Sequence, residues 1–263
     1  MELRFSIFYL LLFIFCFSCK LKTENEQRKF IESKLFGKVK SVETKSFKND
    51  TLKSVELEIY RKDGMIKKTK FRFEPNLSFG EALYEYNYKN ELEKKIIISD
   101  GDTTNTELYF YNDLGLFKKE EYYENKLQSI TNYEMDSTGR IAGKNFKYLN
   151  SDGLRTFKFF YPDSLTTIIK EFLRENLYAT TEIKIYPQEN KKTIIKERTF
   201  PESIFGEILY LNDEGNIIKK ERLNGNKITK TEKFTYELDL NKNWIKSESG
   251  TIRKERKIEY YEK

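Results

Sequence analysis

Aromatic side chains are the residues of this chain whose type and spacing point most directly to chemistry. The sequence has 18 Tyr and 21 Phe against a single Trp. Several of these rings alternate with polar residues, which places them on one face of an extended strand. Rings repeated along such a face can stack on sugars or grip a peptide strand. The candidates for ligand stacking are Tyr84, Tyr86, Tyr88, Tyr109, Tyr111, Tyr122, Tyr123 and Trp244.

The same rings have a structural interpretation, which we favour over ligand stacking. Aromatic pairs on neighbouring strands stabilise a sheet by about 0.2–1 kcal/mol each. A sheet protein with this many rings would need them to hold its strands together.

Few other groups suit catalysis or metal binding. The chain has no His, the commonest general base and metal ligand. Its two cysteines, Cys16 and Cys19, both lie near the N-terminus, so no thiolate nucleophile or cysteine zinc site is expected further along. The sequence also contains no glycine-rich phosphate loop and no serine nucleophile elbow. We therefore predict a protein that is not an enzyme, with no catalytic residue, metal site or cofactor.

Carboxylates are the one abundant class of reactive group, with 42 Asp and Glu. Glycoside hydrolysis needs two carboxylates at a fixed separation in a cleft, and no pair in the sequence stands out. The segments Asp100-Gly-Asp102 and Asp213-Glu-Gly215 carry oxygen ligands for calcium. They lack the ligand spacing of a calcium-binding hand, and we interpret both as turns.

An apolar run near the N-terminus predicts export. Residues 5–18 follow Arg4 and are too few to span a membrane as a helix, which takes about 20 residues. Their length is typical of the apolar region of a signal peptide. The run ends at Phe17-Ser18-Cys19 and a polar segment follows. A small residue before cysteine at this place resembles a bacterial lipoprotein signal, which implies that Cys19 carries the lipid. An ordinary secretory signal peptide or an uncleaved anchor is the alternative.

Behind the leader, the sequence divides into a tether and a body. Residues 19–36 are mostly polar, and the weak helical spacing of Phe30, Ile31 and Leu35 allows a short helix there. From Gly37 onward, apolar and polar residues alternate as in strands. The expected organisation is a lipoprotein signal peptide over 1–18, a tether over 19–36 and a β-repeat domain over 37–263.

Turn signals in the body form two interleaved series, each with a period of about 25 residues. The first turn series comprises Gly64, Asn90, Gly115, Gly139, Asp163, Glu189, Gly215 and Asn241. The second turn series comprises Asn49, Pro75, Asp100, Asn125, Ser151, Glu175, Pro201, Asn224 and Ser249. The chain therefore reverses about every 12 to 13 residues, which suits strands and excludes long helices.

These reversals predict an all-β fold. Consecutive strands joined by short turns pair antiparallel, so the body should be a meander of about 16 strands in hairpin repeats of about 25 residues. Because twist accumulates across many strands, a flat sheet of this size is not expected. We predict a long twisted or coiled sheet, as a superhelical ribbon or a partly closed shell.

The repeat unit resembles a known pattern. Tyr60 to Lys68 reads Tyr-x-x-x-Gly-x-Ile-x-Lys and Tyr111 to Lys119 reads Tyr-x-x-x-Gly-x-Phe-x-Lys, a pattern similar to the YD or RHS repeat. The stretch Phe234 to Lys246 and the segment Gly37 to Val42 are similar to the end and the beginning of uncharacterised Bacteroidota lipoproteins. Leu238 and Lys242 depart from that pattern. The resemblance implies a β-repeat body on an envelope lipoprotein and implies no activity.

The net charge and the predicted export together limit the classes of function to be expected. The net charge of +6 is a small excess spread through the chain, whereas nucleic-acid binders usually concentrate basic residues, so no nucleic-acid partner is expected. We expect an exported protein of the cell envelope, anchored by lipid in the outer membrane, with a non-catalytic binding or scaffold role towards a protein or carbohydrate partner. A carboxylate-based envelope hydrolase and a partner-capping or immunity-type protein that pairs through an edge strand are the alternatives.

Overall fold

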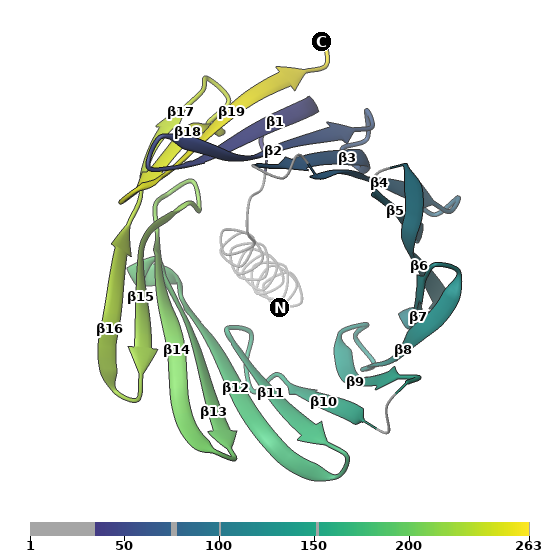
Figure 1. Cartoon of the computed structure of the whole chain (residues 1–263). Helices are drawn as coiled ribbons and strands as arrows, with labels where there is room; N and C mark the ends of the chain where they lie inside the picture. Colours follow the sequence, from purple (N-terminus) through teal and green to yellow (C-terminus); the bar gives the residue numbers. More distant parts are fainter. Residues whose placement is uncertain (1–34, 75–77, 100, 151–152, 263) are drawn as a thin grey trace, which may run out of the picture.

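The computed structural model describes residues 35–74, 78–99, 101–150 and 153–262. The predicted signal peptide, Cys19 and nearly all of the predicted tether lie outside the described residues. The described chain is a ring of antiparallel strands with a single turn of 3-10 helix, η1 (Pro187–Glu189). Figure 1 looks down the axis of this ring.

The sheet contains 19 strands in sequence order around the ring. The first ten are β1 (Val39–Lys48), β2 (Thr51–Tyr60), β3 (Ile66–Phe73), β4 (Ser78–Tyr86), β5 (Leu92–Ser99), β6 (Asp102–Asn112), β7 (Gly115–Tyr123), β8 (Lys126–Met135), β9 (Ile141–Tyr148) and β10 (Leu154–Phe160). The others are β11 (Thr166–Leu173), β12 (Asn176–Tyr186), β13 (Lys191–Thr199), β14 (Glu202–Leu211), β15 (Ile217–Asn224), β16 (Lys227–Lys233), β17 (Thr235–Leu238), β18 (Trp244–Ser249) and β19 (Ile252–Tyr260).

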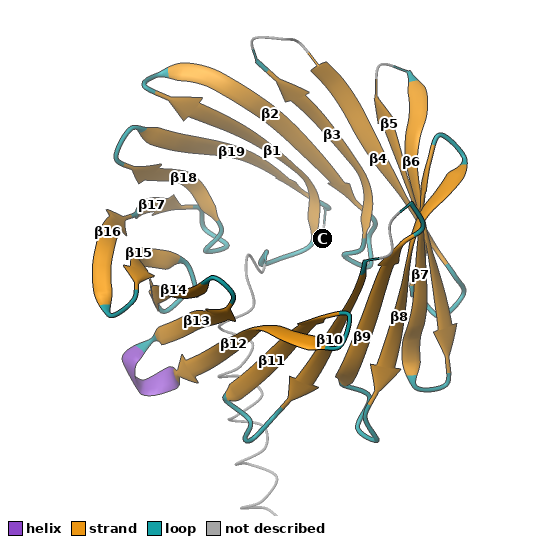
Figure 2. Cartoon of the chain, turned by 60° about the horizontal axis from the view of Figure 1, so that its bottom comes forward, coloured by secondary structure: helices purple, strands orange, loops and turns teal. Residues whose placement is uncertain are grey.

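The all-β antiparallel meander is confirmed, and the expected long twisted or coiled sheet is corrected to a nearly closed one. The first and last strands pair, with Val42 opposite Ile258 and Phe47 opposite Arg253. The sheet is therefore a nearly closed, barrel-like ring, because β19 lies beside β1 (Figure 1). The strand number is 19 and not about 16, in part because the segment from Lys227 to Leu238 is broken into β16 and β17. Figure 2 shows the strands of the ring from a second direction.

Asn and Asp side chains organise the turns of the first series. In four of these turns, one side-chain oxygen accepts hydrogen bonds from backbone N–H groups two and four residues later. A single residue thus holds the whole reversal, as expected for an Asx turn. The four residues are Asn87, Asp136, Asn212 and Asp239.

The closure of the ring repeats this hairpin geometry without a connecting turn. The N–H of Tyr261 donates to the carbonyl of Lys38 at 2.8 Å, as the N–H of Asn87 does to Glu91 at 2.9 Å. Gly37 has φ +84°, close to the +87° of Gly64 in the first hairpin of the series. The segments around Gly37 and Tyr261 therefore form one more hairpin of the repeat, although they are distant in the chain.

Candidate functional site

The inner face of the ring is the candidate functional surface. Cross-strand register places the most buried side chains on one face of the sheet, and these are Val42, Ala82, Ser129, Thr131 and Ala179. In a closed sheet, side chains on the concave side converge and cover one another, while alternate side chains point outward. We therefore assign the buried face to the inside of the ring.

The pKa shifts support this assignment. On the inner face burial is the largest influence, raising the pKa of Tyr109 and Tyr133 and lowering that of Lys144. On the outer face, hydrogen bonds from lysine dominate and lower the pKa of Glu120 and Glu221. The largest influence on the pKa of these groups thus differs between the two faces, burial on the inner face and hydrogen bonding on the outer face.

A polar cluster lies on the inner face between β5 and β8. Lys95 Nζ donates to Glu107 Oε1 at 3.2 Å, and the Tyr109 hydroxyl donates to the same carboxylate. Glu121, on the next strand, accepts hydrogen bonds from the ammonium group of Lys119 and the hydroxyl of Ser129, the latter at 2.7 Å. Glu107 stands directly opposite Glu121 in the register. Each carboxylate of the pair is therefore neutralised by its own lysine.

The contacts with Lys119 and Ser129 keep Glu121 ionised. Burial raises the pKa of this carboxyl, but the hydrogen bonds from Lys119 and Ser129 outweigh burial and leave the pKa below its usual value. An acid that donates a proton needs a raised pKa instead. This cluster is consequently suited to binding polar groups and not to acid catalysis.

We expect Glu121→Gln to lower the free energy of unfolding by about 1–2 kcal/mol at pH 7, since two hydrogen bonds to a charged acceptor are weakened. A carboxyl with a depressed folded pKa stabilises the protein above its unfolded pKa and loses this effect as the pH falls through the folded pKa. The difference from wild type should therefore shrink below about pH 4. Urea unfolding at several pH values measures the difference in unfolding free energy between wild type and Glu121→Gln, with the exposed Glu202→Gln as control. A difference that persists at pH 3 would contradict the ionised, hydrogen-bonded state assigned to Glu121.

A second cluster lies where the ring closes. Glu56, Thr44 and Arg256 form one cross-strand row on β2, β1 and β19. The guanidinium carbon of Arg256 is 3.5 Å from the ring centroid of Trp244, a stacked cation–π contact. Desolvation and then repulsion from Glu58 raise the pKa of Glu56. Glu56 is exposed, so solvent screens both effects.

Two predicted stacking residues are held by hydrogen bonds to the backbone. The Tyr86 hydroxyl donates to the carbonyl of Ile66 at 2.7 Å, and the Tyr111 hydroxyl to that of Leu92 at 3.0 Å. Tyr161 and Tyr236 make the same bond 20 and 19 residues back. Three of these bonds tie a hairpin to itself, and that of Tyr236 joins β17 to β15, which supports the structural interpretation of the aromatic ladder.

The remaining predicted aromatic residues are dispersed. Tyr109 belongs to the inner cluster, Tyr84 is half-buried on the same face, and one face of the Trp244 ring is covered by Arg256. Tyr88 is 90% exposed in the turn after β4. Tyr122 bonds Glu120 on the outer face, and Tyr123 is exposed at the end of β7. The structure does not gather the predicted residues into one site.

Sequence reasoning missed the inner charged residues. Lys95, Glu107, Lys119 and Glu121 carry no motif, and only the cross-strand register brings them together. It also missed Asn243, whose side chain bonds the backbone of Phe36 across the closure.

The described residues contain no group of three or more His, Cys, Asp or Glu arranged to hold a metal ion. In this same part of the chain, no helix is long and apolar enough to cross a membrane.

Comparison with known proteins gives only distant likenesses. Neither the protein-family comparison nor the comparison with curated proteins finds a match. A porin-like protein from Bacteroides uniformis has 13% identity, covers 86% of this chain and 98% of its own, and superposes with a TM-score of 0.49. The TcdB2-TccC3-Cdc42 structure has 11% identity over 71% of this chain and 12% of its own, with a TM-score of 0.37.

A third likeness is of the same kind. The Tc holotoxin pore of Photorhabdus luminescens has 10% identity over 76% of this chain and 12% of its own, with a TM-score of 0.32. These TM-scores are too low to carry an argument about function.

Proposed function

We propose that the mature protein is an envelope lipoprotein that binds a partner, or scaffolds an assembly, without catalysing a reaction. The observation that carries the proposal is the inner face, where acids and lysines neutralise one another in pairs around aromatic rings. Such a surface offers hydrogen bonds and ring faces to a protein or carbohydrate. A carboxylate that lysine holds ionised is a poor proton donor, which favours binding over general acid catalysis.

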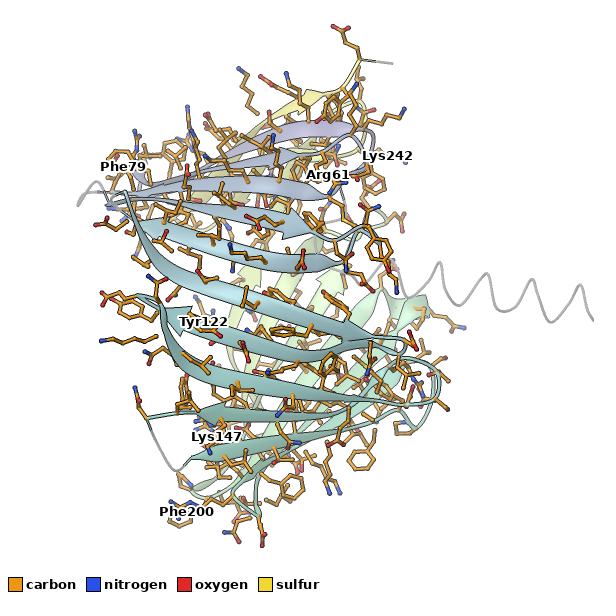
Figure 3. The ribbon with its side chains drawn as sticks, turned by 90° about the vertical axis from the view of Figure 1, so that its right-hand side faces the viewer. Arg61, Phe79, Tyr122, Lys147, Phe200 and Lys242 are labelled. Atoms are coloured by element: carbon orange, nitrogen blue, oxygen red, sulfur yellow. The ribbon has the colours of Figure 1, made fainter. Side chains whose placement is uncertain are left out.

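The place where the described chain begins indicates how an anchored ring would stand. Gly37 lies against Tyr260 and Asn241, at the rim that carries the first turn series. Figure 3 shows Arg61 and Lys242 at this end of the ring and Phe79 and Phe200 at the other. A lipid on Cys19 would hold the first rim towards the membrane. The opposite rim, where Phe79 is 52% and Phe200 82% exposed, would face away and be free to meet a partner.

Lipid attachment at Cys19 is tested by metabolic labelling with a palmitate analogue. The wild-type chain should be labelled and Cys19→Ala should lose the label, with Cys16→Ala as the matched control that keeps it. Because one acyl chain binds a membrane only marginally, stable anchoring implies at least two. Unchanged labelling of Cys19→Ala would reject the anchor. Affinity capture of the anchored protein from intact cells tests the binding role, and the absence of any retained molecule would count against it.

A carboxylate-based envelope hydrolase is the second candidate, favoured by Glu56. Its raised pKa is what a proton donor needs, and Glu58 lies two residues away on the same face. Envelope polysaccharides incubated with the wild-type protein and with Glu56→Gln test this candidate. Equal cleavage by both, or cleavage by neither, would remove it.

A further inference from the structure

The ring has one opening, at the point where β16 meets β17. Among the described strands, β16 pairs only with β15 and β17 pairs only with β18. The two follow one another in the chain and are separated by Phe234, whose N–H still donates to the carbonyl of Ile218 at 2.9 Å. In the described part of the ring, every other strand has a neighbour on each side.

The opening exists because β18 is too short to cover β16. The last registered pair between β17 and β18 joins Thr235 to Glu248. Two residues beyond Glu248, the chain turns at Gly250 towards β19. Lys227–Lys233 consequently has no strand on its second side, and six of its seven residues are exposed. Figure 1 shows β16 at the flank of the ring, separated from β18.

The open edge is basic. β16 carries Lys227, Lys230 and Lys233 against a single acid, Glu232. Glu232 is already paired with Lys230 at 2.8 Å and with Arg222 at 3.5 Å. Neither Lys227 nor Lys233 has an ion-pair partner among the residues that the structure describes. The edge thus presents free ammonium groups together with Ile228, which is 53% exposed.

We propose that this edge binds an extended acidic segment of a partner protein, which pairs with β16 as an added antiparallel or parallel strand. The backbone groups of β16 would supply the hydrogen bonds, and the lysines would select carboxylates on the added strand. A second copy of the chain is disfavoured as occupant, because two such edges would bring three lysines against three. The proposal rests on the binding role proposed above and names the class of partner.

Lysines on an edge strand can also serve to prevent pairing, and the test must separate the two roles. Residues along a strand point their backbone groups alternately to the two sides. Because the N–H of Phe234 faces β15, that of Thr231 faces the opening. Thr231→Pro therefore removes one donor from the open edge while the bonds to β15 remain. Thr231→Val is the matched control that keeps the donor.

The probe is a fluorescent peptide of about eight residues that alternates valine and glutamate, measured by anisotropy with the full-length, detergent-solubilised protein. We expect saturable binding, about tenfold or more tighter than that of a valine–lysine peptide. Thr231→Pro should abolish it, and Thr231→Val should not. Changing Lys227, Lys230 and Lys233 to Glu should reverse the preference. Thermal unfolding confirms that each variant is folded.

Equal binding of both peptides, or binding that survives Thr231→Pro, would overturn the proposal. If neither peptide binds, the lysines serve to prevent strand pairing at this edge, and this result would also overturn the proposal. A partner that is captured from cells equally by wild type and Thr231→Pro would leave the binding role in place while removing this edge as its site.

Discussion

Asn243→Ala is expected to lower the free energy of unfolding by about 3 kcal/mol, since it removes three hydrogen bonds of about 1 kcal/mol each from a buried site. The Oδ1 atom of Asn243 accepts from the Phe36 N–H at 2.7 Å. Its Nδ2 donates to the Phe36 carbonyl at 2.8 Å and to the Tyr260 hydroxyl at 2.7 Å. The residue is only 3% exposed, so water cannot replace these partners in place.

The effect should exceed that of an ordinary turn residue because Asn243 joins three segments that are distant in the chain. It belongs to the turn before β18, and it holds both the entry to β1 and the end of β19. The Tyr260 hydroxyl in turn donates to Asp239. The closing hairpin has no covalent turn of its own, so these side-chain bonds take the place of one.

Chemical denaturation of wild type and Asn243→Ala measures the loss, and the exposed Asn226→Ala in the turn after β15 is the control. Hydrogen exchange should show faster opening of β1 and β19 than of β6 and β7. A loss within about 0.5 kcal/mol of the control would mean that the strand pairing of β1 with β19 closes the ring unaided.

Much of the fold was predictable because turn chemistry is local. Glycine and Asx residues mark reversals by their own backbone preferences. Gly64, Asn90 and Gly215 do adopt positive φ in the first turn series. Strand alternation likewise depends only on which side chains face water. The antiparallel meander and the near absence of helix followed from these two signals.

Closure of the ring was not predictable in the same way. It depends on whether the twist of each strand pair brings β19 back to β1, which no short segment encodes. One signal was present: Gly37-Lys-Val39 repeats the glycine and the apolar residue of Gly64-Met-Ile66. No predicted strand precedes Gly37, so the sequence did not show which strand would complete this hairpin. The matching first half stands at the other end of the chain, at Tyr260 and Tyr261.

The candidate site was predicted less well than the fold. The tyrosines stood out because aromatic residues are conspicuous in a sequence, yet Tyr86 and Tyr111 bond the backbone. The inner cluster stayed hidden, because lysine and glutamate occur on both faces and only register and curvature decide which of them face inward. The outer pair of Lys118 and Glu120, at 2.6 Å, looks the same in sequence as the inner pair of Lys119 and Glu121.

Gly206→Ala is expected to cost about 3 kcal/mol of unfolding free energy, because an added methyl group would overlap backbone that cannot move aside. Gly206 lies within β14, opposite Ile195 of β13 and Leu223 of β15. A Cβ atom there would stand 2.4 Å from the carbonyl oxygen of Ile194 and 3.1 Å from the Cα of Ile195. Relief would require β13 and β14 to separate, which breaks their hydrogen bonds.

Gly80 provides the comparison that isolates this cause. A Cβ atom at Gly80 would lie 2.3 Å from the ring of Phe71, the far end of a side chain that can rotate away. Its closest backbone neighbour would be the carbonyl oxygen of Ile98 at 3.0 Å, a less severe overlap than the 2.4 Å at Gly206. Gly80→Ala should therefore cost only about 1 kcal/mol, and less in a Phe71→Leu background. Chemical denaturation of the Gly206→Ala protein, of Gly80→Ala and of the double variant measures all three losses. If Gly206→Ala costs no more than Gly80→Ala, close backbone approach is not what selects glycine in β14.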